Sequence, residues 1–414
     1  MPFNKFIRTK KGLFIIVLAT IVIVSLTGLA CWEVTRFLRS NISRVYYNRG
    51  NAELKDENVD AAIAQYNEAI KFNPENALAY DGRGVANLKN GLLQAAILDF
   101  TRTISLKPGY ANGYYNRGIA FYRSGKFDNA ILDYHAALRL DAAHTNAWYS
   151  LGLTYTQMRH FDQAIQTFTE AIRLNPNSQD AYYARGFAYC STSNFDLAIS
   201  DCTRATEIDP KDAVAYQGRA GIYFVMNEFD NAITDYTTAI KLEPNCENAY
   251  FFRARAFQKK KEFSRAIDDY NSAIELSSNK SYLYQELGWS YHCNGDFEKA
   301  ITNYLQAIQI NPKYSLAYND YAWLLSTCTN ASFRNAQKAV EMATKACDLT
   351  RWKDGNRIDT LAAAYAESGD FDRAVEYETQ AIKVGRLTEQ QTAEAQQRLH
   401  LYLQGKPYRE SPAE

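Results

Sequence analysis

The fold is decided by the stretch AVAYQGRAGIYFVMNEFDNAITDYTTAIKLEPNC, residues 213–246, because its pattern recurs along most of the chain. It places a tyrosine at 216, a small residue at 220 and an alanine at 232, and the same features return every 34 residues. The small residue recurs as Gly50, Gly84, Gly118, Gly152, Gly186, Ala220, Ala254 and Gly288, and the alanine as Ala62, Ala96, Ala130, Ala164, Ala198, Ala232, Ala266 and Ala300. A fixed period of this length indicates a helical repeat instead of several independent domains.

Each period contains two segments that we expect to form antiparallel helices. The small residue on the first helix and the alanine on the second let the two backbones approach closely, and aromatic residues fill the space on either side. One such unit cannot bury both of its faces, so neighbouring units should stack. The aromatic positions of the repeat also account for most of the 30 tyrosines, which we therefore expect to be packing residues.

The order aromatic, small residue, aromatic, alanine, aromatic, alanine, proline resembles the tetratricopeptide repeat (TPR). The resemblance extends from Ser43 to about Arg386, with a ninth unit that holds extra residues around 330–335. It implies an all-α, right-handed superhelical α-solenoid of about ten helix-turn-helix units. The closing segment is similar to that of many bacterial members of this family.

Residues 12–32 contain no charged side chain, and as a helix they would be about 31 Å long. We expect a single transmembrane helix there; a cleaved signal peptide is the alternative, although its apolar core would be shorter. The basic flanks weakly favour an N-terminus inside the cell. The resulting expectation is a single-pass protein of the bacterial inner membrane with periplasmic repeats.

The expected organisation follows from these patterns. It comprises a basic flank 1–11, a transmembrane helix 12–32, a juxtamembrane linker 33–42, eight TPR units 43–314, an irregular ninth unit 315–354, a tenth unit 355–387, and a capping helix with a tail 388–414. Thr388 and Gln391 have the spacing of a capping box, and Gly405 suits the end of the last helix. The outer face of that helix, including Arg398, should be polar.

An arginine precedes the small residue in several units, and an aspartate follows it sixteen residues later in five of them. Where leucine replaces the arginine, at 151 and 287, the aspartate is also replaced, by Thr167 and Asn303. We therefore predict ion pairs within units, because a partly buried arginine needs an acceptor; an arginine ladder that binds a ligand is the alternative. The predicted pairs are Arg83–Asp99, Arg117–Asp133, Arg185–Asp201, Arg219–Asp235 and Arg253–Asp269.

In the family that the repeat resembles, the concave surface formed by first helices generally binds peptides. The resemblance therefore implies a peptide-binding groove lined by amide, basic and aromatic side chains of the N-terminal units. The positions concerned are Arg44, Asn48, Asn51, Lys55, Lys89, Asn112, Tyr115, Asn116, Arg123, Tyr149 and Tyr183. Alternatively, the basic groups simply solvate the groove. The carboxylate clamp of co-chaperone members is not expected, since only Asn51 matches its pattern.

The sequence contains no pattern typical of a catalytic or metal-binding site. The five histidines occupy unrelated repeat positions, and the seven cysteines do not have the spacing of zinc ligands. Phosphate loops and nucleophile elbows are absent from the sequence, and the repeats leave no room for a catalytic domain. We expect no enzyme activity, no catalytic residue, no metal and no cofactor.

The charge balance, 46 basic against 46 acidic residues, argues against a polybasic nucleic-acid binder. We therefore expect a membrane-anchored scaffold or adaptor that binds protein or peptide partners and not nucleic acid. An RNA-binding helical repeat, and a non-catalytic subunit of a membrane-associated enzyme or secretion assembly, are the alternatives.

Overall fold

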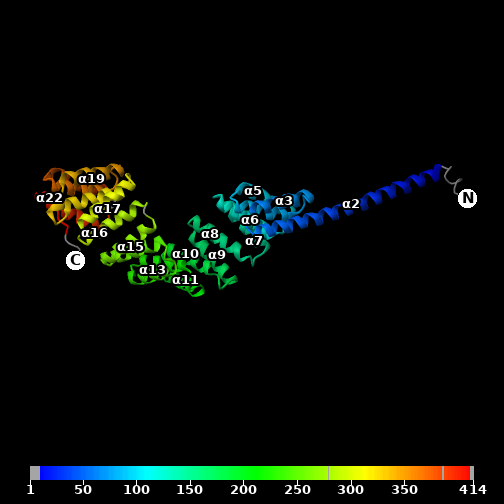
Figure 1. The fold of residues 1–414 in the computed structure, drawn as a ribbon, viewed down its shortest axis with the longest axis horizontal. Helices are drawn as coiled ribbons and strands as arrows, with labels where there is room; N and C mark the ends of the chain where they lie inside the picture. The colour runs from blue at the N-terminus through cyan, green and yellow to red at the C-terminus, as the bar shows by residue number, and fades with distance from the viewer. Residues whose placement is uncertain (1–9, 278, 385–386, 411–414) are drawn as a thin grey trace. The chain divides into compact units, whose positions relative to one another are not determined.

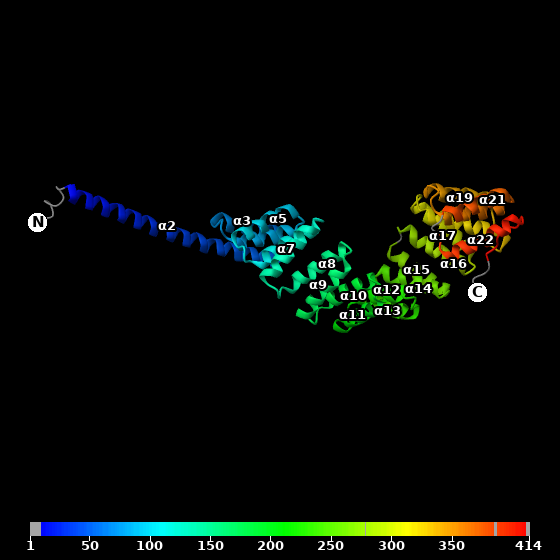
Figure 2. The same cartoon turned by 180° about the vertical axis from the view of Figure 1, so that it is seen from behind.

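The computed structural model describes the backbone of residues 10–277, 279–384 and 387–410, with side chains from residue 32 onward. Within these ranges every regular element is a helix (Figures 1 and 2). The all-α repeat architecture is therefore confirmed. The helices group into two compact units, Met1–Thr192 and Ser193–Glu414.

The N-terminal unit consists of consecutive helix pairs. Its helices are α2 (Lys10–Lys55), α3 (Val59–Phe72), α4 (Ala77–Lys89), α5 (Leu93–Leu106), α6 (Ala111–Arg123), α7 (Phe127–Leu140), α8 (Thr145–Gln157), α9 (Phe161–Leu174) and α10 (Gln179–Ser191). Even-numbered helices are the first helices of repeats and odd-numbered ones the second. Each second helix also packs on the following first helix, so that neighbouring repeats share a continuous interior.

The C-terminal unit continues the same alternation. Its helices are α11 (Phe195–Ile208), α12 (Ala213–Val225), α13 (Phe229–Leu242), α14 (Glu247–Lys259), α15 (Phe263–Leu276), α16 (Ser281–Cys293), α17 (Phe297–Ile310), α18 (Ser315–Thr327), α19 (Ala336–Leu349), α20 (Gly355–Glu367), α21 (Phe371–Val384) and α22 (Glu389–Leu403). The extra residues of the ninth unit form a short 3-10 helix, Ala331–Phe333, between α18 and α19.

Close contact between the two helices of a repeat depends on the small residue of the first helix. A Cβ added to Gly118 would lie 2.6 Å from Cε1 of Tyr134, which is fully buried on the second helix. Gly84 stands in the same relation to Phe100, and Gly152 to Phe168. The sequence predicted close approach through the small residue and the alanine, whereas the structure places the small residue directly against a buried ring of the second helix.

The turn inside each repeat uses one residue with a left-handed backbone. Its φ is positive at Glu57, Gly91, Gly125, Arg159, Ser193, Asn227, Lys261 and Gly295, again at intervals of 34 residues. Glycine adopts this conformation without strain, whereas a side chain makes it costly. The spacing of the repeat is thus maintained even where the preferred residue is missing.

At the C-terminus, α22 covers the last repeat. The Thr388 hydroxyl accepts from the Gln391 backbone, and the Gln391 side chain accepts from the Thr388 backbone, which is a complete capping box. Arg398 is buried, contrary to our expectation of an outer polar face, because its guanidinium pairs with Asp359 at 2.8 Å. Tyr402 is also buried, and its ring fills the cluster around Ala362 and Ala374.

The prediction of a transmembrane helix over 12–32, and with it a single-pass protein of the inner membrane, needs correction. Among the described residues, no helix combines the length and apolar character needed to cross a bilayer. The predicted segment is the first part of one continuous helix, α2, and its side chains up to residue 31 lie outside the description. From residue 32 on, α2 carries seven charged side chains, and the expected linker 33–42 is helical.

Candidate peptide-binding surface

The predicted arginine–aspartate positions are brought together within repeats. In the second repeat, Arg83 donates from Nη2 to Oδ1 of Asp99 at 2.6 Å and from Nε to Oδ2 at 3.0 Å. The pairs Arg117–Asp133, Arg219–Asp235 and Arg253–Asp269 have the same two-bond geometry, with distances of 2.6–2.9 Å. These four aspartates are each 5% exposed. The two N–H donors of each guanidinium therefore satisfy a carboxylate that is shielded from water.

The fifth predicted pair lies across the division of the chain, because Arg185 belongs to the N-terminal unit and Asp201 to the C-terminal unit. It remains a prediction. Within its own unit, Arg185 donates from Nη1 to the Thr169 hydroxyl at 3.0 Å.

That contact belongs to a second set of bonds that sequence reasoning missed. The other arm of each arginine reaches the second helix of the preceding repeat, sixteen residues upstream. The bonds join Arg83 to Asn67 at 2.6 Å, Arg117 to Thr101 at 3.2 Å, Arg219 to Thr203 at 3.1 Å and Arg253 to Thr237 at 2.9 Å. One guanidinium therefore connects the two helices of its own repeat and also links that repeat to the previous one.

The sequence contained a signal for this acceptor. Upstream of Arg117, Arg185, Arg219 and Arg253 the residue is threonine, and upstream of Arg83 it is asparagine. Upstream of Leu151, where the arginine is missing, it is His135. The aspartate is lost wherever leucine replaces the arginine, whereas the upstream acceptor follows the arginine less strictly, since Asn271 remains upstream of Leu287.

The basic and amide residues predicted for the groove lie at or near the surface of the N-terminal unit. Arg44, Asn48, Asn51, Lys55, Lys89, Asn112 and Arg123 are exposed, whereas Tyr115, Asn116, Tyr149 and Tyr183 are half-buried. Asn51 accepts a bond of 2.7 Å from the hydroxyl of the buried Tyr66. The Arg123 guanidinium donates to the backbone oxygen of Leu88 at 3.3 Å, and so joins α6 to α4.

Part of this predicted set forms a polar network across α4, α6 and α8. Asn116 donates to Oδ1 of Asp81 at 3.0 Å, and burial raises the pKa of that carboxyl group. Asn112 lies 3.0 Å from Nε2 of His144, whose ring lies 4.7 Å from that of Tyr115. First helices of successive repeats therefore present amide, carboxyl, imidazole and phenol groups on a shared face.

The first helices of the C-terminal unit carry a polar row that the repeat pattern did not indicate. Gln285 on α16 donates to Oδ2 of Asp320 on α18 at 2.7 Å, and Asn319 donates to the other oxygen at 3.2 Å. Gln258 on α14 donates to Oε2 of Glu286 at 3.2 Å. The row therefore runs over three consecutive first helices.

The carboxyl groups of this row are poorly solvated. Burial raises the pKa of Asp320 to about 6 and also raises the pKa of Glu286, and the amide donors only partly oppose the effect. Oδ1 of Asn319 is buried and has no hydrogen-bond partner within the described part of the chain. Gln285, Asn319 and Asp320 are buried, so their bonds join neighbouring first helices, and the half-buried Gln258 and Glu286 are the part of the row that is open to solvent.

The described residues bring together no three histidine, cysteine, aspartate or glutamate side chains in a metal-binding arrangement. The candidate site is a surface of hydrogen-bonding and aromatic groups on successive first helices.

Known protein families match the chain in stretches that agree with its 34-residue units. A model of the tetratricopeptide repeat matches residues 145–178, 213–246 and 281–314, a TPR model matches residues 50–91 and 120–158, and two further tetratricopeptide models match residues 167–200 and 247–280. No curated protein matches the chain.

Several solved structures are similar to parts of the chain. The MamA protein is 27% identical, with a TM-score of 0.38, over 42% of this chain and 94% of MamA. A tetratricopeptide repeat protein from Parabacteroides merdae is 22% identical, with a TM-score of 0.48, over 60% and 99%. YrrB, a TPR protein with an unusual peptide-binding site, is 23% identical, with a TM-score of 0.39, over 44% and 95%. Together, the register, the packing and the family models show that this chain is a tetratricopeptide repeat protein.

Proposed function

We propose that this protein is a non-catalytic scaffold that binds segments of protein partners on the face formed by its first helices. The proposal is carried by one observation: half-buried side chains of successive first helices are hydrogen-bonded to each other across repeats, as in Asn116–Asp81 and Gln258–Glu286. These bonds hold amide and carboxyl groups at fixed separations along the stack. An extended peptide needs such regularly placed donors and acceptors for its backbone and polar side chains.

Site-specific photo-crosslinking tests this proposal. A photoreactive residue at Asn48 or Lys89, both exposed on first helices, should yield covalent protein adducts in the organism that makes the chain. The matched control is Leu132, which is 67% exposed but lies on the second helix α7. Adducts at Leu132 alone, or adducts that disappear after nuclease treatment, would contradict the proposal, and the second outcome would favour an RNA-binding repeat.

A further inference from the structure

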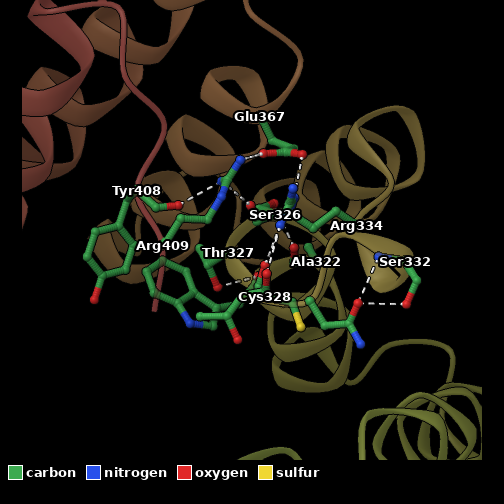
Figure 3. Close-up of polar contacts among 12 residues, drawn as sticks. Ala322, Ser326, Thr327, Cys328, Ser332, Arg334, Glu367, Tyr408 and Arg409 are labelled. Atoms are coloured by element: carbon green, nitrogen blue, oxygen red, sulfur yellow. Dashed lines mark hydrogen bonds and ion pairs between the residues drawn. The ribbon is translucent and has the colours of Figure 1, made fainter. Parts of the chain in front are cut away.

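The last described segment of the chain, residues 406–410, has no regular structure and folds back onto the first helices. The helix α22 ends at Leu403 and is followed by a left-handed turn at Gly405, where φ is 68°, and Lys406 donates its backbone N–H to the oxygen of Leu401. The chain then crosses the C-terminal end of α18. Figure 3 shows Tyr408 and Arg409 beside Ser326, Thr327 and Glu367.

Arg409 occupies a place suited to a cation. Its Nη2 lies 2.6 Å from Oε2 of Glu367, the last residue of α20, and its Nη1 donates to the backbone oxygen of Ser326 at 3.2 Å. The backbone N–H of Glu410 donates to the oxygen of Thr327 at 3.0 Å. The last carbonyls of a helix have no partner inside the helix, so the tail supplies donors that α18 itself lacks.

Glu410 occupies a place suited to a carboxylate. Its Oε2 accepts from Nε1 of Trp323 at 3.0 Å and from the Thr327 hydroxyl at 3.5 Å, and it lies 3.2 Å from Nε2 of His292. Three side chains from α16 and α18 thus converge on one carboxylate oxygen. Trp323 occurs at the repeat position of Asn51, which belongs to the predicted peptide groove.

Tyr408 completes the arrangement by packing on an aromatic surface. Its ring lies 5.8 Å from that of Trp323, and the guanidinium of Arg398 lies 5.6 Å from Tyr408 and 5.4 Å from Trp323. A ring that contacts both an indole and a cation is stabilised by each of them. The three adjacent positions therefore select an aromatic residue, an arginine and an acidic residue, in that order.

The receiving side is held in place by bonds that do not involve the tail. Glu367 is also paired with Arg334 at 3.0 Å, and Arg334 in turn donates to the backbone oxygen of Cys328 at 2.9 Å (Figure 3). Arg398 is fixed by Asp359 in the buried interior. If the tail left, these groups would stay oriented. Another segment could then bind without the entropic cost of ordering them.

We propose that Tyr408–Glu410 is a built-in occupant of a peptide site on α16, α18 and α20, and that a partner segment with the order aromatic, arginine, acidic residue displaces it. The inference deepens the proposed scaffold function and rests on it, since it names the chemistry of one partner and a means of regulation. The tethered tail competes at an effective concentration in the millimolar range, so it sets a threshold that a partner must exceed.

The test uses the full chain and a fluorescent peptide with the sequence of residues 404–410, QGKPYRE. In one variant the tail is disabled by Tyr408→Ala, Arg409→Ala and Glu410→Ala together. The peptide should bind this variant at least tenfold more tightly than it binds the unaltered chain, whose own tail occupies the site. A peptide with the last two residues exchanged, QGKPYER, should lose at least tenfold in affinity.

A second variant tests whether a change in peptide affinity comes from the site itself and not from damage to the fold. Adding Glu367→Gln to the disabled tail should reduce peptide binding at least tenfold, and an unchanged denaturation midpoint would show that weakening the Glu367–Arg334 pair has not disturbed the fold. The single change Glu410→Lys should give a peptide affinity between those of the unaltered and the disabled chain. Equal affinity for all chains, or equal binding of both peptides, would overturn the inference. Crosslinking at Asn48 or Lys89 does not depend on this site, so failure of the tail proposal and failure of the scaffold proposal are distinguishable.

Discussion

At the scale of the residue, the arginine of each repeat has a well-defined structural role. Its carboxylate partner is buried, so loss of the guanidinium alone leaves a buried charge unpaired. Loss of both charges together removes the energetic cost of burying that unpaired charge. The chain contains a natural version of the second case. In the fourth repeat Leu151 is buried where the arginine would be, and the hydroxyl of Thr167 bonds to the backbone of its own helix at 2.9 Å.

These observations lead to a prediction for the third repeat. Arg117→Leu alone should lower the free energy of unfolding by about 3 kcal/mol, because Asp133 is left buried and unpaired. The double change Arg117→Leu with Asp133→Thr should recover more than half of that loss. Chemical denaturation followed by circular dichroism provides the measurement, and additive effects of the two single changes would show that the pair is not coupled.

At the scale of the element, the left-handed residue of the turn controls how one helix passes into the next. Gly125 and Arg159 occupy equivalent positions, with φ of 71° and 61°. A Cβ at Gly125 would meet no atom within 4 Å, so any effect of adding one comes from the backbone alone. This isolates the conformational cost from packing.

The two turns should respond in opposite directions. Gly125→Ala should destabilise the protein by about 1 kcal/mol, and Arg159→Gly should stabilise it by several tenths of a kcal/mol, since glycine relieves strain but gains freedom in the unfolded chain. Denaturant midpoints of the two variants provide the comparison. Gly221→Ala serves as the control, because this glycine lies inside α12 and an added Cβ meets only the Tyr236 hydroxyl at 3.8 Å. A loss of stability in both turn variants would argue against backbone strain as the cause.

At the scale of the whole molecule, several carboxyl groups on both first and second helices have raised pKa values because they are buried. Asp320 titrates near pH 6 instead of its ordinary 3.8, and the pKa of Glu378 is raised by burial and by its neighbour Asp359. A group whose pKa is higher in the folded state binds its proton more tightly there. Its stabilising contribution is therefore present below the unfolded pKa and is lost as the pH rises through the folded value.

The folded protein should accordingly lose stability between about pH 4 and pH 7, with up to about 3 kcal/mol of the loss due to Asp320. Asp320→Asn should remove this part of the pH dependence, because asparagine keeps an acceptor for Gln285 but does not ionise. Unfolding curves of both proteins at a series of pH values measure the difference. Parallel pH profiles would indicate that Asp320 keeps an ordinary pKa in the folded state.

How much of this was accessible from the sequence depends on whether a feature repeats. The helices, the small residue of each repeat and the positions of Arg83 and Asp99 recur in register, so comparison of repeats was sufficient to find them. The exposure of Arg398 was wrongly predicted because α22 occurs once in the chain. Its helical pattern does not show that Asp359 lies in the interior within hydrogen-bond distance of Arg398.

The polar row and the tail site were missed for the same physical reason. Gln285 and Asp320 occupy the repeat positions of Asp81 and Asn116, and Trp323 occupies that of Trp289, but most other repeats differ there, so the periodic signal is weak. Their importance arises from contacts between repeats and from the return of Glu410, which lies 87 residues along the chain from Trp323. Such proximity is a property of the folded stack alone.

The double role of the arginine has a consequence for how an array of this kind can grow. The second unit carries Arg83 at its first helix and Thr101 at its second, and the sixth carries Arg219 and Thr237. Each of these units therefore holds both the cation and the acceptor of the contact that links neighbouring repeats. A gene duplication that copies one such unit in tandem therefore creates a junction that is already complementary. Lengthening the protein then requires no accompanying mutation, whereas insertion directly before the fourth unit would place the acceptor of the new unit against Leu151 and leave it without a cation.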